Sequence, residues 1–286
     1  MSDRSTDLMR TLRAADPDRY LSVLYAPQDR RADLLALYAF NAEIAGIRDR
    51  VSEPMPGEIR LQWWRDMIEA GTPDAAAGSP VATALLEAIG ANGLPRAAFA
   101  GYLEARTFDL YDDPMPSRND LEGYCGETAS ALIQLAALIL DAEAAPGHAE
   151  PAGHAGCAQA VAGLLRLMPI HRVRGQCYVP ADILGAAGGS VAEFLAPDAS
   201  DALLARVVAA MAALGRQHLA AFKSAAGGLP APLRPAFLPV APVGHYLSVL
   251  EKAGAAAARS PVAMSALRRH VAMLRRAAGG WRAASN

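Results

Sequence analysis

The chain has 286 residues, of which 52% are hydrophobic and 20% charged, and its 27 basic and 29 acidic residues give a formal net charge of −2. A chain of this length can bury one large core, so we expect a single domain over residues 1–286. The balanced charge gives no overall attraction to nucleic acid, which excludes that class of partner. The 3 cysteines lack metal-ligand spacing and the N-terminus lacks the apolar core of a signal peptide, so we expect a cytoplasmic protein.

The first half of the chain shows apolar residues at helical spacing. Asp16 is placed to cap a short helix that begins at Pro17 and runs to about residue 25. Residues 32–68 predict two helices, and a kinked turn that includes Pro54 separates them. Further helices are expected over residues 81–89, 96–110 and 120–140.

The second half of the chain is also expected to be helical. A loop rich in Ala, Gly and Pro is predicted over residues 142–156 and contains His148 and His154. Helices follow over residues 158–168, 191–194, 199–225, 235–253 and 261–278. Because no two-residue alternation is sustained, the pattern predicts an all-α fold. The longest apolar run, 131–140, is about half the length that spans a bilayer, which argues against integral insertion.

Several segments resemble the squalene and phytoene synthase family in order and spacing. They are Leu37-Tyr-Ala-Phe40, Tyr124-Cys125, Gly163-Leu-Leu-Arg166 and Arg174-Gly-Gln-Cys-Tyr-Val-Pro-Ala-Asp182, and the last is the most specific. The resemblance covers about residues 15–250. It implies an isoprenoid-synthase helical bundle around a central apolar cavity, in which two prenyl diphosphates condense head to head.

The same resemblance implies that two Asp-rich segments should hold Mg²⁺ ions against the diphosphates. Mg²⁺ prefers oxygen ligands, and the ions neutralise the leaving groups. In the first segment the acidic positions read Ala45, Gly46 and Asp49, so Asp49 is the only carboxylate retained. The second segment retains none, and its positions read Gly163, Leu167, Ile170 and His171. We therefore predict no metal site and no cofactor, with Mg²⁺ required only if the protein is an active synthase.

Other residues near these segments could alter the site. Pro169 falls inside the second segment, where it is expected to break or kink the helix. Glu53 beside Asp49, and the pair Asp112 and Asp113, are alternative carboxylates. Both sets adjoin prolines, which favours solvated side chains at helix ends over metal ligands.

Arginine and tyrosine residues at family positions could bind an anionic head group or a diphosphate without metal. Guanidinium groups pair well with phosphate. The candidates for this binding are Arg166, Arg174, Tyr178, Tyr38 and His171. The alternative is that the two arginines form ion pairs with Glu43, Asp49 or Asp182 and tie helices together.

The sequence around the motifs resembles one branch of the family. Residues 39–43, 61–65 and 109–116 are similar to phytoene-synthase-like proteins related to a mitochondrial assembly factor of respiratory complex I. The resemblance implies a non-catalytic scaffold that helps to build the NADH dehydrogenase from complex I subunits. The absence of an organelle-targeting segment favours a bacterial form. An active head-to-head prenyltransferase and a carrier of a prenyl lipid in the cavity remain alternatives.

The C-terminal segment, about residues 261–282, predicts a basic amphipathic helix. Leu267, Val271 and Leu274 form an apolar stripe. The basic side chains are Arg268, Arg269, Arg275 and Arg276, with Trp281 and Arg282 beyond them. This arrangement suits peripheral contact with anionic lipid at the inner membrane face. The alternative is a final helix that packs on the bundle and exposes its basic face to solvent.

Overall fold

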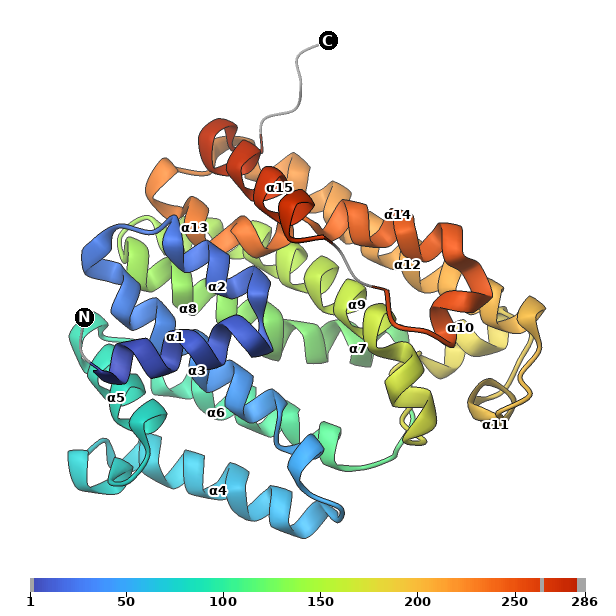
Figure 1. The fold of residues 1–286 in the computed structure, drawn as a ribbon, viewed down its shortest axis with the longest axis horizontal. Helices are drawn as coiled ribbons and strands as arrows, with labels where there is room; N and C mark the ends of the chain where they lie inside the picture. The colour runs from blue at the N-terminus through green and yellow to red at the C-terminus, as the bar shows by residue number, and fades with distance from the viewer. Residues whose placement is uncertain (1–2, 263–264, 282–286) are drawn as a thin grey trace.

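The computed structural model describes residues 3–262 and 265–281. These ranges contain α-helices, 3₁₀ turns and a π-helical turn but no β-strand, which confirms the all-α class. The α-helices are α1 (Asp3–Ala15), α2 (Pro17–Leu24), α3 (Arg31–Ala45), α4 (Pro54–Ala70), α5 (Pro80–Asn92), α6 (Arg96–Thr107), α7 (Arg118–Cys125), α8 (Ala131–Leu140), α9 (Ala149–Val173), α10 (Ala181–Ala186), α11 (Val191–Leu195), α12 (Asp201–Ala225), α13 (Arg234–Phe237), α14 (Val243–Ala253) and α15 (Ala266–Gly279) (Figure 1).

The long helices α9 and α12 pack along each other at the centre of the bundle (Figure 1). Helices α8 and α14 also pack against α9, while α3 packs against α1 and α5. Helix α4 lies at the outer edge against α6, and α15 lies at the opposite side of the molecule beside α13 (Figure 1). The buried apolar side chains of these helices form one connected core.

The helix pair predicted over residues 32–68 is present as α3 and α4. Helix α3 ends before Gly46, whose N–H donates to a carbonyl of the last turn at 3.1 Å. The 3₁₀ turn Arg48–Arg50 follows, so Asp49 lies in this turn and not on the helix. Helix α4 then begins at Pro54, a position that needs no N–H donor.

The start of α2 follows the predicted pattern. The Asp16 side chain accepts a hydrogen bond from Arg19 N at 3.0 Å, and Pro17 is the first helical residue. Helices α1 and α10 were not predicted. The first has a largely polar sequence with few apolar residues, and the second has 6 residues, too few to establish a period.

The loop predicted over residues 142–156 is wrong, because α9 begins at Ala149. Pro151 lies in the first turn of this helix, where the backbone N–H groups have no partner within the helix. Pro169 was predicted to break or kink the helix, and the break does not occur, because α9 continues to Val173. Packing along α12 holds the helix together despite the missing hydrogen bond.

Two predicted helices near the C-terminus differ in extent. The helix expected over residues 235–253 is divided into α13, the 3₁₀ turn Leu238–Val240 and α14, since Pro239 and Pro242 cannot donate to a continuous helix. The helix expected over 261–282 begins at Ala266. Residues 263–264 and 282 of that prediction lie outside the described residues.

The helix predicted over residues 120–140 comprises α7, the π-helical turn Gly126–Ser130 and α8. By length and composition, the continuous stretch Arg118–Leu140 could cross a membrane, but 61% of its most apolar window is buried inside the bundle. It therefore has the character of a core helix.

The π-helical turn lies very close to Gly156 of α9. A Cβ atom placed on Gly156 would stand 2.4 Å from the backbone of Ser130, which is too close for any rotamer change to relieve. A Cβ atom at Gly163 on the same helix would meet nothing within 4 Å. The close approach of α9 to the π-helical turn therefore depends on glycine at position 156.

We expect Gly156→Ala to lower the free energy of unfolding by about 1–3 kcal/mol, because α9 must move away from the core helix. The control Gly163→Ala should be neutral or stabilising by up to about 1 kcal/mol. Urea unfolding followed by circular dichroism measures both. Equal stability of the two variants would contradict the close approach.

Candidate functional site

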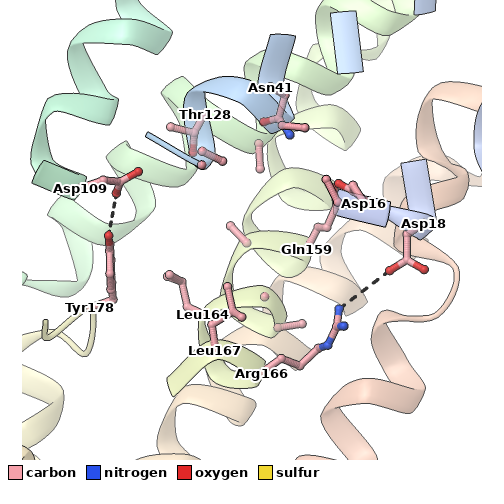
Figure 2. Close-up of a pocket in the computed structure, with 18 of the residues that line it drawn as sticks. Asp16, Asp18, Asn41, Asp109, Thr128, Gln159, Leu164, Arg166, Leu167 and Tyr178 are labelled. Carbon is pink, nitrogen blue, oxygen red and sulfur yellow. Dashed lines mark hydrogen bonds and ion pairs between the residues drawn. The ribbon is translucent and has the colours of Figure 1, made fainter. Parts of the chain in front are cut away.

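The two segments that resemble family metal motifs line one pocket. Its volume is about 560 Å³, and helices α2, α3 and α9 contribute much of its wall. The motif positions that line it are Ala45, Gly46, Asp49, Gly163, Leu167, Ile170 and His171. Figure 2 shows Leu164, Arg166 and Leu167 on α9, with Asn41 and Thr128 on the neighbouring helices. The structure thus brings together residues that are far apart in the sequence.

These motif positions do not supply a Mg²⁺ site. Ala45, Gly46 and Gly163 carry no donor atom in their side chains, and Leu167 and Ile170 are apolar. The one retained carboxylate, on Asp49, forms an ion pair with Arg174. Among the described residues, no group of three or more His, Cys, Asp and Glu side chains could hold a metal ion. The donor set therefore does not fit the metal that the family resemblance implies.

The two candidate arginines are already paired with carboxylates. Arg174 contacts Asp49, one of the predicted partners, and joins the end of α9 to the turn after α3. Arg166 lies 4.0 Å from Asp18, which was not among the predicted partners. Its guanidinium group also stacks on the ring of Tyr246, 4.1 Å from the centroid. These contacts support the interpretation in which the arginines tie helices together.

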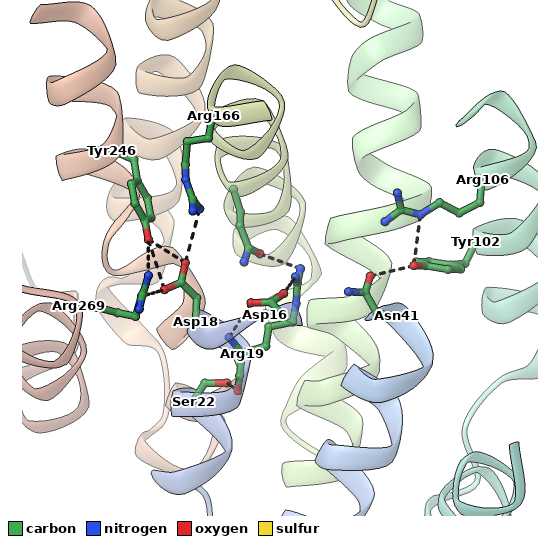
Figure 3. A network of polar contacts seen from close by, with 11 residues as sticks. Asp16, Asp18, Arg19, Ser22, Asn41, Tyr102, Arg106, Arg166, Tyr246 and Arg269 are labelled. Atoms are coloured by element: carbon green, nitrogen blue, oxygen red, sulfur yellow. Dashed lines mark hydrogen bonds and ion pairs between the residues drawn. The ribbon is translucent and has the colours of Figure 1, made fainter. Parts of the chain in front are cut away.

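Asp18 is the centre of a buried polar network at one end of the pocket (Figure 3). Arg269 of α15 pairs with its carboxylate, and Tyr246 of α14 donates a hydrogen bond at 3.2 Å. Burial raises the pKa of Asp18, as does the charge of Asp16, while Arg269 and Arg166 lower it. In the sequence, Asp18 looks like an ordinary first-turn acid, so no local signal identifies this role.

A second network surrounds Asp109, on another part of the pocket wall. Tyr178 and Tyr124 each donate to its Oδ1 at 2.8 Å, and Arg106 donates to its Oδ2 at 2.9 Å. Burial and the nearby Asp109 raise the pKa of Tyr178 far above its ordinary value. Tyr178 is therefore a neutral hydrogen-bond donor, and its hydroxyl is directed at the protein's own carboxylate (Figure 2).

The remaining two candidates occupy different environments. His171 lines the pocket with its ring against Tyr178, 4.6 Å between centroids. Burial, the largest cause, lowers the pKa of His171 to about 4, so the ring is neutral near pH 7. Tyr38 does not line the pocket; it is buried in the core beneath the guanidinium group of Arg19. Burial raises the pKa of Tyr38 to about 12.

The other sequence candidates lie away from this chemistry. Asp112 pairs with Arg48 at 3.3 Å, and Glu53 precedes the first residue of α4. His154, predicted in a loop, lies on α9 with its Nδ1 3.1 Å from Nδ1 of His218. His148 ends the 3₁₀ turn before α9.

Further polar groups of the pocket are also paired within the protein. Arg19 contacts Asp16 and donates to Gln159 at 3.3 Å, and Asn41 accepts a hydrogen bond from Tyr102 at 2.8 Å (Figure 3). No described carboxylate among the motif positions is left to ligate a metal or to act as an unpaired base. The lining carries six arginines and four aspartates, and each aspartate contacts an arginine. The arrangement can therefore enclose a ligand and retains an excess of positive charge.

Comparison with known proteins agrees with this architecture. The sequence profile described as "Squalene/phytoene synthase" matches residues 12–273. The chain belongs to this family. The resemblance inferred from the motifs is thereby confirmed, and it extends beyond residue 250 to include part of α15.

Among curated relatives, the family member "NADH dehydrogenase (ubiquinone) complex I, assembly factor 6" of Rattus norvegicus is 31% identical over 245 residues. The match covers 85% of this chain and 73% of that protein. The Homo sapiens protein of the same name is 30% identical with the same coverage. The predicted branch of the family is confirmed by these relatives.

Solved structures of synthases share the fold. A dehydrosqualene synthase in complex with ligand superposes with a TM-score of 0.79 at 18% identity, covering 95% of this chain and 94% of that one. The squalene synthase HpnC from Alicyclobacillus acidocaldarius gives a TM-score of 0.72 at 20% identity, covering 88% and 94%. At these identities the likeness establishes the fold alone.

The lowered pKa of His171 predicts a pH dependence of stability. Between about pH 6.5, where a histidine in an unfolded chain takes up a proton, and about pH 4, the folded ring stays neutral. The unfolded state therefore binds more protons in this window, and stability falls as the pH is lowered through it. We expect His171→Gln to lose less stability than the natural protein between pH 7 and pH 5.

Thermal unfolding at several pH values measures this difference. Asp18 and His218 titrate in both proteins, so their contributions cancel in the comparison. His270→Gln, on the exposed surface of α15, is the matched control and should follow the natural protein. If the His171 and His270 variants show the same pH profile, the assignment to His171 is wrong.

Proposed function

We propose that this chain is a non-catalytic member of the squalene/phytoene synthase family that acts as an assembly factor for respiratory complex I. The observation that carries the proposal is the pocket: both metal-motif segments face it, and only Asp49 retains a carboxylate, which is paired with Arg174. The curated relatives named as complex I assembly factors support the role. The proposal places the protein in the cytoplasm, in contact with complex I subunits as they assemble at the inner membrane.

The argument against catalysis rests on charge. Departure of a diphosphate requires neutralisation of its developing negative charge, which metal ions provide at several kcal/mol. Each 1.4 kcal/mol of lost transition-state stabilisation slows a reaction about tenfold. Arg166 and Arg174 are engaged with Asp18 and Asp49, so they do not replace the missing ions. Binding of the ground state alone would not accelerate the reaction.

We expect no condensation product from the purified protein. It is incubated with farnesyl or geranylgeranyl diphosphate, Mg²⁺ and NADPH, and the extracted lipids are analysed by mass spectrometry. Asp49→Ala is the matched control, and the natural protein should give no more product than this variant. Squalene, phytoene or a cyclopropyl precursor above the control level would establish the alternative, an active prenyltransferase.

We also expect that cells lacking this chain lose assembled complex I. Native gels stained for NADH dehydrogenase activity measure the loss, and expression of the natural chain should restore it. Asp49→Ala should restore it equally, because the proposed role needs no metal-bound substrate. Normal complex I levels in cells without the chain would refute the assembly role. If a folded Asp49→Ala variant fails to restore complex I, the claim that the role needs no catalysis is refuted.

The pocket itself favours a second candidate, carriage of a prenyl lipid. A volume of about 560 Å³ is within the usual range of ligand pockets, and its wall includes Leu164, Leu167 and Ile170. Lipid extraction of the purified protein before any incubation distinguishes the two roles, since a carrier should contain stoichiometric lipid.

A further inference from the structure

Helix α15 is fixed to the bundle by one face. Met273 is fully buried, and Trp281 just beyond the helix packs edge-on against Phe222, with 5.3 Å between ring centroids. Arg269 on the same face pairs with the buried Asp18. At the C-terminal end, Arg234 of α13 donates to the carbonyl of Ala277 at 3.1 Å. These contacts determine which side of α15 faces outward.

The outward side carries the predicted apolar stripe. Leu267 is 73% exposed, Leu274 58% and Val271 37%. Their spacing of four and three residues places them on a single side of the helix. Helix α15 does pack on the bundle, as the alternative expected, but through the side with Met273 and Arg269, so the apolar stripe remains exposed.

Positive charge lies next to the stripe. Arg268 and Arg275 are exposed and seven residues apart, so they form a row beside Leu267 and Leu274. The last 34 residues of the chain contain six arginines and no Asp or Glu, whereas the whole chain has a formal net charge of −2. Two of the six, Arg259 and Arg269, pair with Asp201 and Asp18. The basic charge is thus concentrated at the end of the sequence that presents the exposed leucines.

We propose that the outer face of α15 docks on a membrane surface that contains anionic lipid. Exposed leucines can enter the interface between headgroups and acyl chains, while the neighbouring arginines contact anionic headgroups. A second copy docked symmetrically through the stripe would bring the rows of arginines on two α15 helices together, and their repulsion opposes that arrangement. This surface does not depend on the proposed assembly role.

Another exposed apolar stripe provides a built-in comparison. Met55 and Ile59 of α4 are 69% and 65% exposed, similar to Leu267 and Leu274. The acidic Glu58 and Asp66 lie on the same helix, so the surface around this stripe does not combine apolar side chains with purely basic ones. If apolar exposure alone drove docking, the two stripes would contribute equally.

The test measures vesicle co-sedimentation of the full-length protein. We expect binding to phosphatidylcholine vesicles that contain anionic phosphatidylglycerol, weak binding to pure phosphatidylcholine, and loss of binding as salt is raised. The double variant Leu267→Asp/Leu274→Asp should reduce binding by about tenfold or more. The matched variant Met55→Asp/Ile59→Asp should bind like the natural protein. Circular dichroism confirms that both variants are folded.

The contribution of charge is tested with the double variant Arg268→Glu/Arg275→Glu, which should lose the preference for anionic vesicles. The control Arg13→Glu/Arg60→Glu changes two arginines elsewhere on the surface and should keep that preference. The proposal is overturned if the natural protein does not bind anionic vesicles, or if either α15 variant binds as the natural protein does. It is also overturned if the control variants lose as much binding as the α15 variants. Dimerisation that the Leu267/Leu274 variant abolishes, without vesicle binding by the natural protein, would assign the surface to a second copy.

Discussion

The carboxylate of Asp18 joins four helices, and one end of the pocket depends on it. It belongs to α2 and contacts Arg166 of α9, Tyr246 of α14 and Arg269 of α15. A buried charge without a partner is unfavourable, and removal of one member of a buried pair typically costs about 3–5 kcal/mol. Arg166 and Arg269 both contact this carboxylate, so α9 and α15 cannot move independently of α2.

The same principle operates elsewhere on the pocket wall. Asp109 is satisfied by Arg106 and two tyrosines, and Asp49 by Arg174. In the arrangement that the family's motifs imply, metal ions and diphosphates would balance such charges. Here arginines of the protein pair with these carboxylates, and the pairs hold the pocket wall together without a ligand. A pocket whose carboxylates are already paired with arginines is compatible with a structural role and offers no free carboxylate to hold metal ions at a developing transition state.

The sequence predicted the helices wherever the local chemistry was decisive. Asp16 and Pro17 specify the start of α2, and the prolines in the first turn of α4 mark its start after α3. The expected break at Pro169 did not occur, because packing of α9 along α12 overrides the local preference of proline. Proline occurs here both at helix starts and inside a helix. Whether a given proline ends a helix depends on tertiary contacts, which the sequence does not show.

The site was predictable in part. The motif spacing identified Asp49, Arg166 and Arg174 and anticipated that an arginine would pair with Asp49, because these positions can be compared with a family pattern. The partners Asp18 and Arg269 lie at opposite ends of the chain, and each looks locally like a solvated helix residue. The fold brings Asp18 and Arg269 into contact, and neither periodicity nor motif spacing in the sequence predicts this contact.

The ion pair between Asp18 and Arg269 also determines which side chains α15 exposes on its outer surface. Because Asp18 requires a cation, Arg269 turns inward with Met273, and the helical period then directs Leu267, Val271 and Leu274 away from the bundle. An ion pair inside the pocket thus specifies an apolar stripe on the outside of the molecule. Since Arg269 lines the pocket from the same helix that presents the stripe, a displacement of α15 at its outer face would also move the pocket wall.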